Sequence, residues 1–229
     1  MLELNKVYNE DCLIFMKRLP DDRFDLIITD PPYGINIASN GHVGGEKLGP
    51  VKDYCVCDWD KEIPSKEVFD EMLRVSKNQI IFGGNYFIEY LHNSSCWIVW
   101  DKNNTGNFAD CELAWTSFNT AVRKFKHTWN GMLQERMNWK EKREHPTQKP
   151  VPLGRWILEK YANEGDKIFD PFAGSGSFLV ACKNKGFDFV GCEINKEYVS
   201  ICNNRLNQKG LSDFTEDRKL NNNLKEESK

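Results

Sequence analysis

FDLIITDPPY, residues 24–33, joins a short apolar run to two prolines and a tyrosine. A near-continuous apolar run of this length is typical of a parallel strand that is buried on both faces of a sheet. The prolines end that strand, because each fixes its own φ and the first also restricts Asp30. A carboxylate, a proline carbonyl and an aromatic ring therefore stand together at the carboxyl end of a strand, where ligands bind in open α/β sheets.

These three groups match an exocyclic amine on a nucleobase, which has two N–H donors beside a flat ring. Asp30 and the carbonyl oxygen of Pro31 can accept the two N–H bonds while Tyr33 stacks on the ring. A strand-ending turn with a structural Asp30 is the alternative. The four residues 30–33 by themselves leave both interpretations open.

A second junction between a strand and a turn lies at residues 167–177. Residues 167–169 predict a strand, a glycine-bearing turn with Gly174 and Gly176 follows, and then a helix begins. The next strand, residues 187–193, ends in Glu193, which is placed to bind ribose hydroxyls. A dinucleotide dehydrogenase has the same order of strand, glycine turn, helix and acidic residue, but the third glycine of its motif is absent here. No glycine-Lys-Ser/Thr ending is present either, which excludes a Walker phosphate loop.

Both junctions resemble motifs of one enzyme family. Asp30-Pro31-Pro32-Tyr33 looks like the catalytic motif of the amino-methyltransferases, which methylate adenine N6 or cytosine N4 with S-adenosylmethionine (AdoMet). The segment from Asp170 to Gly176 resembles the AdoMet motif of these enzymes. The catalytic motif comes first, and His145-Pro146-Thr147-Gln148-Lys149-Pro150 directly precedes the second motif. This order is similar to that of the β-group of the family, and the resemblance spans residues 4–206.

The resemblance implies a circularly permuted, Rossmann-like methyltransferase fold: an α/β domain with a single doubly wound, mostly parallel sheet of seven strands. Residues 4–8 would supply the strand that, in the unpermuted fold, follows the helix at residues 196–208. We expect one methyltransferase domain at residues 1–210. Its catalytic half is residues 1–144, and its cofactor half is residues 145–210 plus the N-terminal strand. Residues 211–229 are polar and charged, which predicts a disordered tail.

The implied reaction is site-specific DNA methylation at the N6 amine of a flipped adenine, with S-adenosylhomocysteine as the second product. Cytosine N4 is the alternative base, and a catalytically idle nucleic-acid-binding subunit is the alternative of another class. The catalytic residues carried over are Asp30, Pro31, Pro32 and Tyr33. The expected cofactor-binding residues are Asp11, Cys12, Asp30, His145, Thr147, Lys149, Asp170, Pro171, Phe172, Gly174, Ser175, Gly176, Glu193 and Ile194.

The charges predict where DNA binds. The chain of 229 residues has a formal net charge of −3, which argues against indiscriminate binding to nucleic acid. Residues 123–149 nevertheless are rich in cations and carry interleaved aromatic residues, which suits phosphate contact and base stacking. A solvated strand and loop is the alternative. The expected nucleic-acid-binding residues are Tyr33, Arg123, Lys124, Lys126, Arg136 and Lys140, and the interleaved aromatic residues are Phe125, His127, Trp129 and Trp139.

Composition places the expected enzyme in a reducing compartment. Eight cysteines form no CxxC pair, so we expect free thiols, no metal site and a cytoplasmic protein. No apolar run approaches membrane-spanning length. DNA is the expected partner, with a homodimer and a cognate restriction enzyme as further expected partners. The glycine-bearing residues 34–60 predict a mobile loop that orders when DNA binds.

Overall fold

One eight-stranded sheet organises the part of the chain that the computed structural model describes, residues 2–35, 60–104, 109–130, 133–135, 137–144 and 147–208. The strand order is β1-β10-β9-β2-β3-β5-β4-β6, and β7 and β8 form a separate pair. The strands are β1 (Lys6–Tyr8), β2 (Phe24–Thr29), β3 (Ser76–Phe82), β4 (Trp97–Asp101), β5 (Cys111–Thr116), β6 (Arg123–Lys126), β7 (Trp129–Asn130), β8 (Leu133–Gln134), β9 (Lys167–Asp170) and β10 (Asp188–Cys192).

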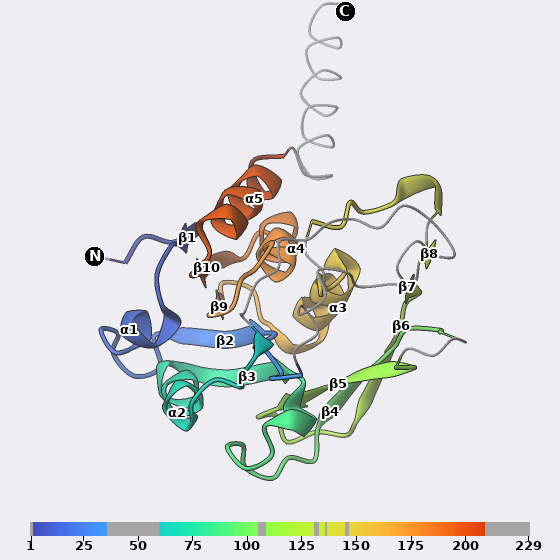
Figure 1. Cartoon of the computed structure of the whole chain (residues 1–229). Helices are drawn as coiled ribbons and strands as arrows, with labels where there is room; N and C mark the ends of the chain where they lie inside the picture. Colours follow the sequence, from blue (N-terminus) through green and yellow to red (C-terminus); the bar gives the residue numbers. More distant parts are fainter. Residues whose placement is uncertain are drawn as a thin grey trace, which may run out of the picture.

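Helices cover both faces of this sheet (Figure 1). The helices are α1 (Cys12–Met16), α2 (Lys66–Val75), α3 (Val151–Tyr161), α4 (Ser177–Lys185) and α5 (Lys196–Asn207), with 3₁₀ turns η2 (Gly84–Tyr86) and η3 (Met137–Trp139). Helices α1 and α2 pack on one face through Phe15, Phe69 and Met72. Helices α3, α4 and α5 pack on the other through residues such as Ile157 and Leu179. Each central strand is therefore apolar on both sides, as its sequence predicts.

The first strand of the described chain pairs with the last one, β10, in the sheet. Strand β1 pairs in parallel with β10, with Val7 opposite Gly191 and Tyr8 opposite Cys192. The backbone N–H of Glu193 also donates to the carbonyl oxygen of Tyr8 at 3.0 Å. The N-terminal strand thus takes the place predicted for it in a permuted fold.

The order in which the chain adds strands to the sheet reverses between β9 and β2. From β9 it continues through α4 to β10, whereas from β2 it continues through α2 to β3 on the other side. Strands β2 and β9 are parallel neighbours. The hydroxyl of Thr29 donates to the Asp170 carboxylate at 2.8 Å across this junction. A crevice at the carboxyl ends of these strands is the expected ligand site of a doubly wound sheet.

Strand β5 is antiparallel to both β3 and β4. Its amino end therefore lies at the edge of the sheet where β2 and β3 have their carboxyl ends. The sheet has one strand more than the seven predicted, because β6 adds to β4 at the edge.

Some predictions concern residues outside the described part of the chain. They are most of the expected loop at 34–60, the expected tail at 211–229, and His145 and Arg136. The division into a catalytic and a cofactor half stays a prediction. Among the described residues, no helix combines the length and apolarity needed to cross a membrane.

Candidate active site

A pocket of about 540 Å³ opens at the carboxyl ends of β10, β9 and β2. It brings together expected cofactor residues that lie far apart in the sequence, from Asp11 at the start of α1 to Glu193 after β10. The expected residues that line it are Asp11, Cys12, Asp30, Thr147, Lys149, Asp170, Pro171, Phe172, Gly174, Ser175, Glu193 and Ile194. Further lining residues, which the sequence analysis missed, are Glu10, Gln148, Ala173, Ser177, Phe178, Asn195 and Tyr198.

Asp170 lies on the floor of this pocket and is 1% exposed. Its Oδ1 accepts the hydroxyl of Thr29 at 2.8 Å and the backbone N–H of Phe172 at 3.1 Å. Burial raises the pKa of Asp170 to about 7, and the negative charges of Asp30 and Glu193 act in the same direction. A cation that enters the pocket will therefore favour the ionised form of this carboxyl.

Glu193 is oriented by the backbone around it. Its Oε2 accepts the N–H of Gly174 at 2.9 Å, and its Oε1 accepts the N–H of Asn195 at 2.7 Å. Burial raises the pKa of Glu193. Each carboxylate oxygen retains a lone pair for a further donor, such as a ribose hydroxyl. At the other side of the pocket, Asp11 caps α1 by accepting the N–H of Ile14 at 3.0 Å.

Asp30 forms the centre of a charged cluster. Its Oδ1 accepts the hydroxyl of Tyr33 at 2.5 Å, and its Oδ2 accepts a short bond from the ammonium of Lys149. Lys149 is 5% exposed and also lies 3.1 Å from an oxygen of Glu112. Burial raises the pKa of Asp30, and Glu112 raises it further while Lys149 opposes the shift. Although burial lowers the pKa of Lys149, the carboxylates of Asp30 and Glu112 raise it overall, so the ammonium stays protonated.

Lys149 was expected among the cofactor residues, and in the structure its ammonium also contacts the carboxylate of Asp30. Glu112 and its second ion-pair partner, Lys102, were missed altogether. Glu112 reaches this cluster because β5 is antiparallel, so its amino end lies beside the carboxyl end of β3. Nothing in the local pattern of residues 111–116 indicates that direction.

Tyr33 is held on both its backbone and its ring. Its backbone N–H donates to Asp60 at 2.8 Å, and its ring stacks on that of Tyr86 with centroids 4.9 Å apart. Gly83 has φ +70°, and a Cβ there would lie 2.1 Å from the Tyr33 ring. A glycine at position 83 is therefore needed for Tyr33 to reach Asp30.

Gly176 is an expected cofactor residue that does not line the pocket. It has φ +80°, and a Cβ there would lie 2.1 Å from the sulfur of Cys202 on α5. This glycine is required because α5 packs closely against the turn. That the backbone at Gly176 also approaches a ligand stays a prediction.

The expected DNA-contacting cations are spread along β6 and the segment that follows. Arg123, Lys124, Lys126 and Lys140 are exposed, and none of them lines the pocket. Lys124 lies 3.4 Å from Asp101. Lys126 ends β6 and Arg123 begins it. Burial raises the pKa of the Tyr161 hydroxyl, and the charge of Arg123 opposes that shift, so Arg123 lies near Tyr161. Tyr161 ends α3, whereas the start of α3, at Val151, comes two residues after Lys149, which lines the pocket.

Two of the interleaved aromatic residues have structural partners. Trp129 is 7% exposed, and its Nε1 donates to the carbonyl oxygen of Gln148 at 3.0 Å. Phe125 packs on Trp156 of α3, with centroids 5.2 Å apart. Stacking of bases on Trp129 is therefore excluded in this conformation, because its ring belongs to the core.

The chemical groups that line the pocket fit AdoMet. AdoMet carries a sulfonium, an ammonium, a carboxylate, ribose hydroxyls and an adenine, and its net charge is positive. The pocket offers carboxylates at Asp30, Asp170 and Glu193 and apolar rings at Phe172 and Phe178. No group of His, Cys, Asp and Glu among the described residues can hold a metal ion.

Comparisons with known proteins agree with this geometry. The sequence pattern of a family described as DNA methylase matches residues 89–204. The chain belongs to this DNA methylase family. It is a DNA methyltransferase that takes its methyl group from AdoMet, and the β-group resemblance drawn from the motifs is confirmed at the level of this family.

Individual relatives cover most of the chain. The Type II methyltransferase M2.DpnII of Streptococcus pneumoniae is 27% identical over 86% of this chain and 88% of its own length. The crystal structure of the M1.HpyAVI–SAM complex matches with a TM-score of 0.55 and 26% identity, over 87% of this chain and 98% of that one. PvuII DNA methyltransferase, described as cytosine-N4-specific, shares the fold with a TM-score of 0.56 at 13% identity, over 92% and 89% of the two chains.

Proposed function

We propose that this methyltransferase acts at specific sites in DNA on the exocyclic N6 amine of adenine. The observation that carries the proposal is Asp30, an aspartate at the edge of the pocket that is held in a fixed orientation by Tyr33 and Lys149. AdoMet, when bound, supplies an electrophilic methyl group.

Asp30 can accept a target amine without losing its present partners. Each carboxylate oxygen has two lone pairs, and Tyr33 and Lys149 use one on each oxygen. The amine would donate one N–H to a remaining lone pair and the other to the carbonyl oxygen of Pro31. These bonds draw the nitrogen toward tetrahedral geometry and free its lone pair for an in-line attack.

The charge of Lys149 favours the ionised form of Asp30, whereas burial raises the pKa of this carboxyl, which suits it to take the proton that the methylated amine must lose. No covalent enzyme intermediate is needed for this transfer. A base inside a duplex cannot reach the pocket edge, so the target nucleotide has to flip out of the helix. Tyr33, which is partly exposed, would then supply a stacking surface.

Cytosine N4 is the second candidate target, because the mechanism serves both amines and a structural neighbour is described as cytosine-N4-specific. Asp30 favours adenine in our proposal, whereas a serine at that position would favour cytosine. A catalytically idle subunit is the candidate from another class. The intact Asp30–Tyr33 pair and the fit of the pocket to AdoMet count against it.

One experiment decides among these functions. Defined DNA is incubated with labelled AdoMet and digested to nucleosides, and the products are identified by mass. We expect N6-methyladenine from the wild type and no product from Asp30→Ala. AdoMet binding by that variant should stay within a few-fold of the wild type, measured by calorimetry. N4-methylcytosine would contradict the adenine assignment, and near-normal turnover by Asp30→Ala would contradict the mechanism.

The proposal extends to partners and compartment. A homodimer and a cognate restriction enzyme are proposed partners besides DNA. A cytoplasmic location is proposed from the unpaired thiols among the described residues, namely Cys12, Cys96, Cys111, Cys182, Cys192 and Cys202.

A further inference from the structure

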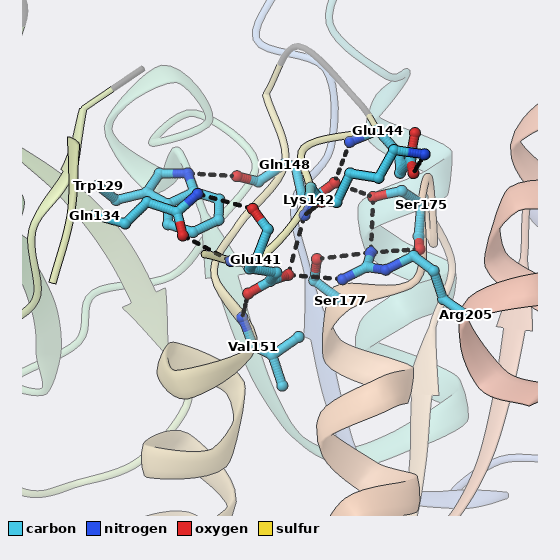
Figure 2. Close-up of polar contacts among 10 residues, drawn as sticks. All are labelled: Trp129, Gln134, Glu141, Lys142, Glu144, Gln148, Val151, Ser175, Ser177 and Arg205. Carbon is cyan, nitrogen blue, oxygen red and sulfur yellow. Dashed lines mark hydrogen bonds and ion pairs between the residues drawn. The ribbon is translucent and has the colours of Figure 1, made fainter. Parts of the chain in front are cut away.

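Gln148 sits between the two ends of the active site, and neither the motifs nor the comparisons give it a role. Its neighbours in the chain, Thr147 and Lys149, both line the pocket. The side chain of Lys149 points to Asp30, whereas the amide of Gln148 points into a polar network behind the AdoMet turn (Figure 2).

The amide of Gln148 is 4% exposed and uses its full hydrogen-bonding capacity. Its Oε1 accepts the N–H of Glu144 at 2.8 Å and the hydroxyl of Ser175 at 3.2 Å. Its Nε2 donates to Glu141 Oε1 at 3.0 Å and to the carbonyl oxygen of Lys142 at 3.1 Å. The indole of Trp129 fixes the backbone of the same residue. Two donors and two acceptors that are all satisfied leave one orientation for this amide.

Glu141 and Arg205 complete the network (Figure 2). The carboxylate of Glu141 accepts from Arg205 at 2.7 Å and from the backbone N–H of Val151, at the start of α3, at 3.0 Å. Arg205, on α5, also donates to the carbonyl oxygen of Ser175 at 2.6 Å. Charge-assisted bonds in a buried site are stronger than neutral ones, so this pair ties α5 and α3 to the turn.

Ser175 is where this network meets the cofactor. It lies between Gly174 and Gly176, lines the pocket and is 4% exposed. Its hydroxyl contacts Gln148, and both its hydroxyl and its carbonyl oxygen contact Arg205. The position of the turn therefore depends on side chains from two other parts of the chain.

We propose that Gln148 is a positioning residue for both halves of the reaction. Through Ser175 it sets the turn that binds AdoMet, and through its own backbone it sets Lys149 against Asp30. Glu141 and Arg205 hold Gln148 and Ser175 at fixed positions relative to each other. The proposal rests on the proposed function in one respect, the placement of the acceptor amine at Asp30.

The test compares Gln148→Met with Gln79→Met. Gln79, on β3, is a matched control because its buried amide donates to the backbone and hydroxyl of Ser76, away from the pocket. Melting temperature, the AdoMet dissociation constant without DNA, and kcat at saturating AdoMet are measured for both. We expect Gln148→Met to raise the dissociation constant about tenfold and lower kcat about tenfold, since it removes the four polar contacts of a buried amide. Gln79→Met should lower the melting temperature by a similar amount and change both other values less than twofold.

Arg205→Lys tests the AdoMet end of the network separately from the Asp30 end. It also provides a test of the proposal if Gln148→Met folds poorly. A lysine keeps the charge beside Glu141 but cannot also reach Ser175, because it lacks the guanidinium fork. It should raise the AdoMet dissociation constant several-fold and leave kcat at saturating AdoMet unchanged. Effects of Gln148→Met no larger than those of Gln79→Met, or an unchanged AdoMet dissociation constant in Arg205→Lys, would overturn the proposal. AdoMet binding without DNA is independent of the target base, and the identity of the methylated nucleoside tests the proposed function separately.

Discussion

Glu112 gives the active site a second carboxylate that competes with Asp30 for Lys149. Both carboxylates are within ion-pair distance of the same ammonium. Burial raises the pKa of Asp30, the charge of Lys149 opposes this shift and that of Glu112 adds to it, so the ionisation of the proposed catalytic residue depends in part on a side chain on β5.

This dependence predicts a shift in the pH profile. Asp30 has to be ionised to accept the amine, so methyl transfer is lost as pH falls through the pKa of Asp30. Glu112→Gln removes a negative neighbour that raises that pKa, so the acid limb of kcat should move to lower pH. The measurement is the pH dependence of kcat at saturating AdoMet and DNA. Glu159→Gln is the control and should leave the limb in place, because it removes an exposed carboxylate of α3 that pairs with Lys185 of α4 and does not line the pocket. A shift toward higher pH in Glu112→Gln would contradict the argument.

At this scale the sequence predicts residues that act through local context and misses those that act across the sheet. Asp30 and Glu193 each follow a strand and Asp170 ends one, so their place at one edge is readable from the chain. Glu112 lies near the start of β5 and reaches the site only because that strand is antiparallel. Gln148 is held by Ser175 and Glu141, which Arg205 of α5 contacts in turn. Those contacts depend on packing between distant segments.

Among the helices, α5 packs so closely against the turn at position 176 that this position requires a glycine. Cys202 of α5 lies against the turn at Gly176, which also has a left-handed backbone. Gly186, after α4, has a similar φ of +76° and nothing within 4 Å of an added Cβ. A comparison of Gly176 with Gly186 therefore separates the cost of backbone strain from the cost of steric contact.

Substitution of each glycine by alanine should therefore differ in cost. Gly186→Ala should lower the free energy of unfolding by about 1–2 kcal/mol, the strain of a left-handed alanine. Gly176→Ala should lower it by a further 1–3 kcal/mol or so, because the added methyl group collides with Cys202. Chemical denaturation measures both, and Cys202→Ala in the Gly176→Ala background should recover part of the loss. Equal costs at the two sites would show that α5 moves away without penalty.

The elements also show how far a permuted topology can be read from sequence. The pairing of the N-terminal strand β1 with β10 follows from the order of the motifs and is confirmed. The eighth strand β6 and the burial of Trp129 do not follow, because a basic strand with alternating aromatic residues is equally compatible with an exposed surface. Phe125 packs on Trp156, a partner about thirty residues further along the chain, so its burial depends on where α3 lies.

For the whole molecule, the direction of the strands determines which cations can approach DNA near the pocket. Strand β6 is parallel to β4 and thus runs in the same direction as β2 and β3. Lys126 ends β6, and Arg123 begins it about 10 Å further back, at a rise of about 3.3 Å per residue. The net charge of −3 adds no general attraction, so binding to phosphates depends on the few cations at the correct edge.

This arrangement predicts a difference between two cations of one strand. A lysine or arginine that contacts a phosphate contributes about −0.9 to the slope of log affinity against log salt. Lys126→Gln should reduce the magnitude of that slope by about this amount and weaken DNA binding, because Lys126 lies toward the carboxyl edge where the target base must enter. Arg123→Gln removes the same charge from the same strand, yet it should leave both quantities nearly unchanged, since Arg123 lies toward the far end of α3. Fluorescence anisotropy with a short duplex at several salt concentrations measures both slopes. Equal losses in the two variants would mean that DNA lies along β6 as a whole, and a larger loss in Arg123→Gln would place it at the opposite end of the strand.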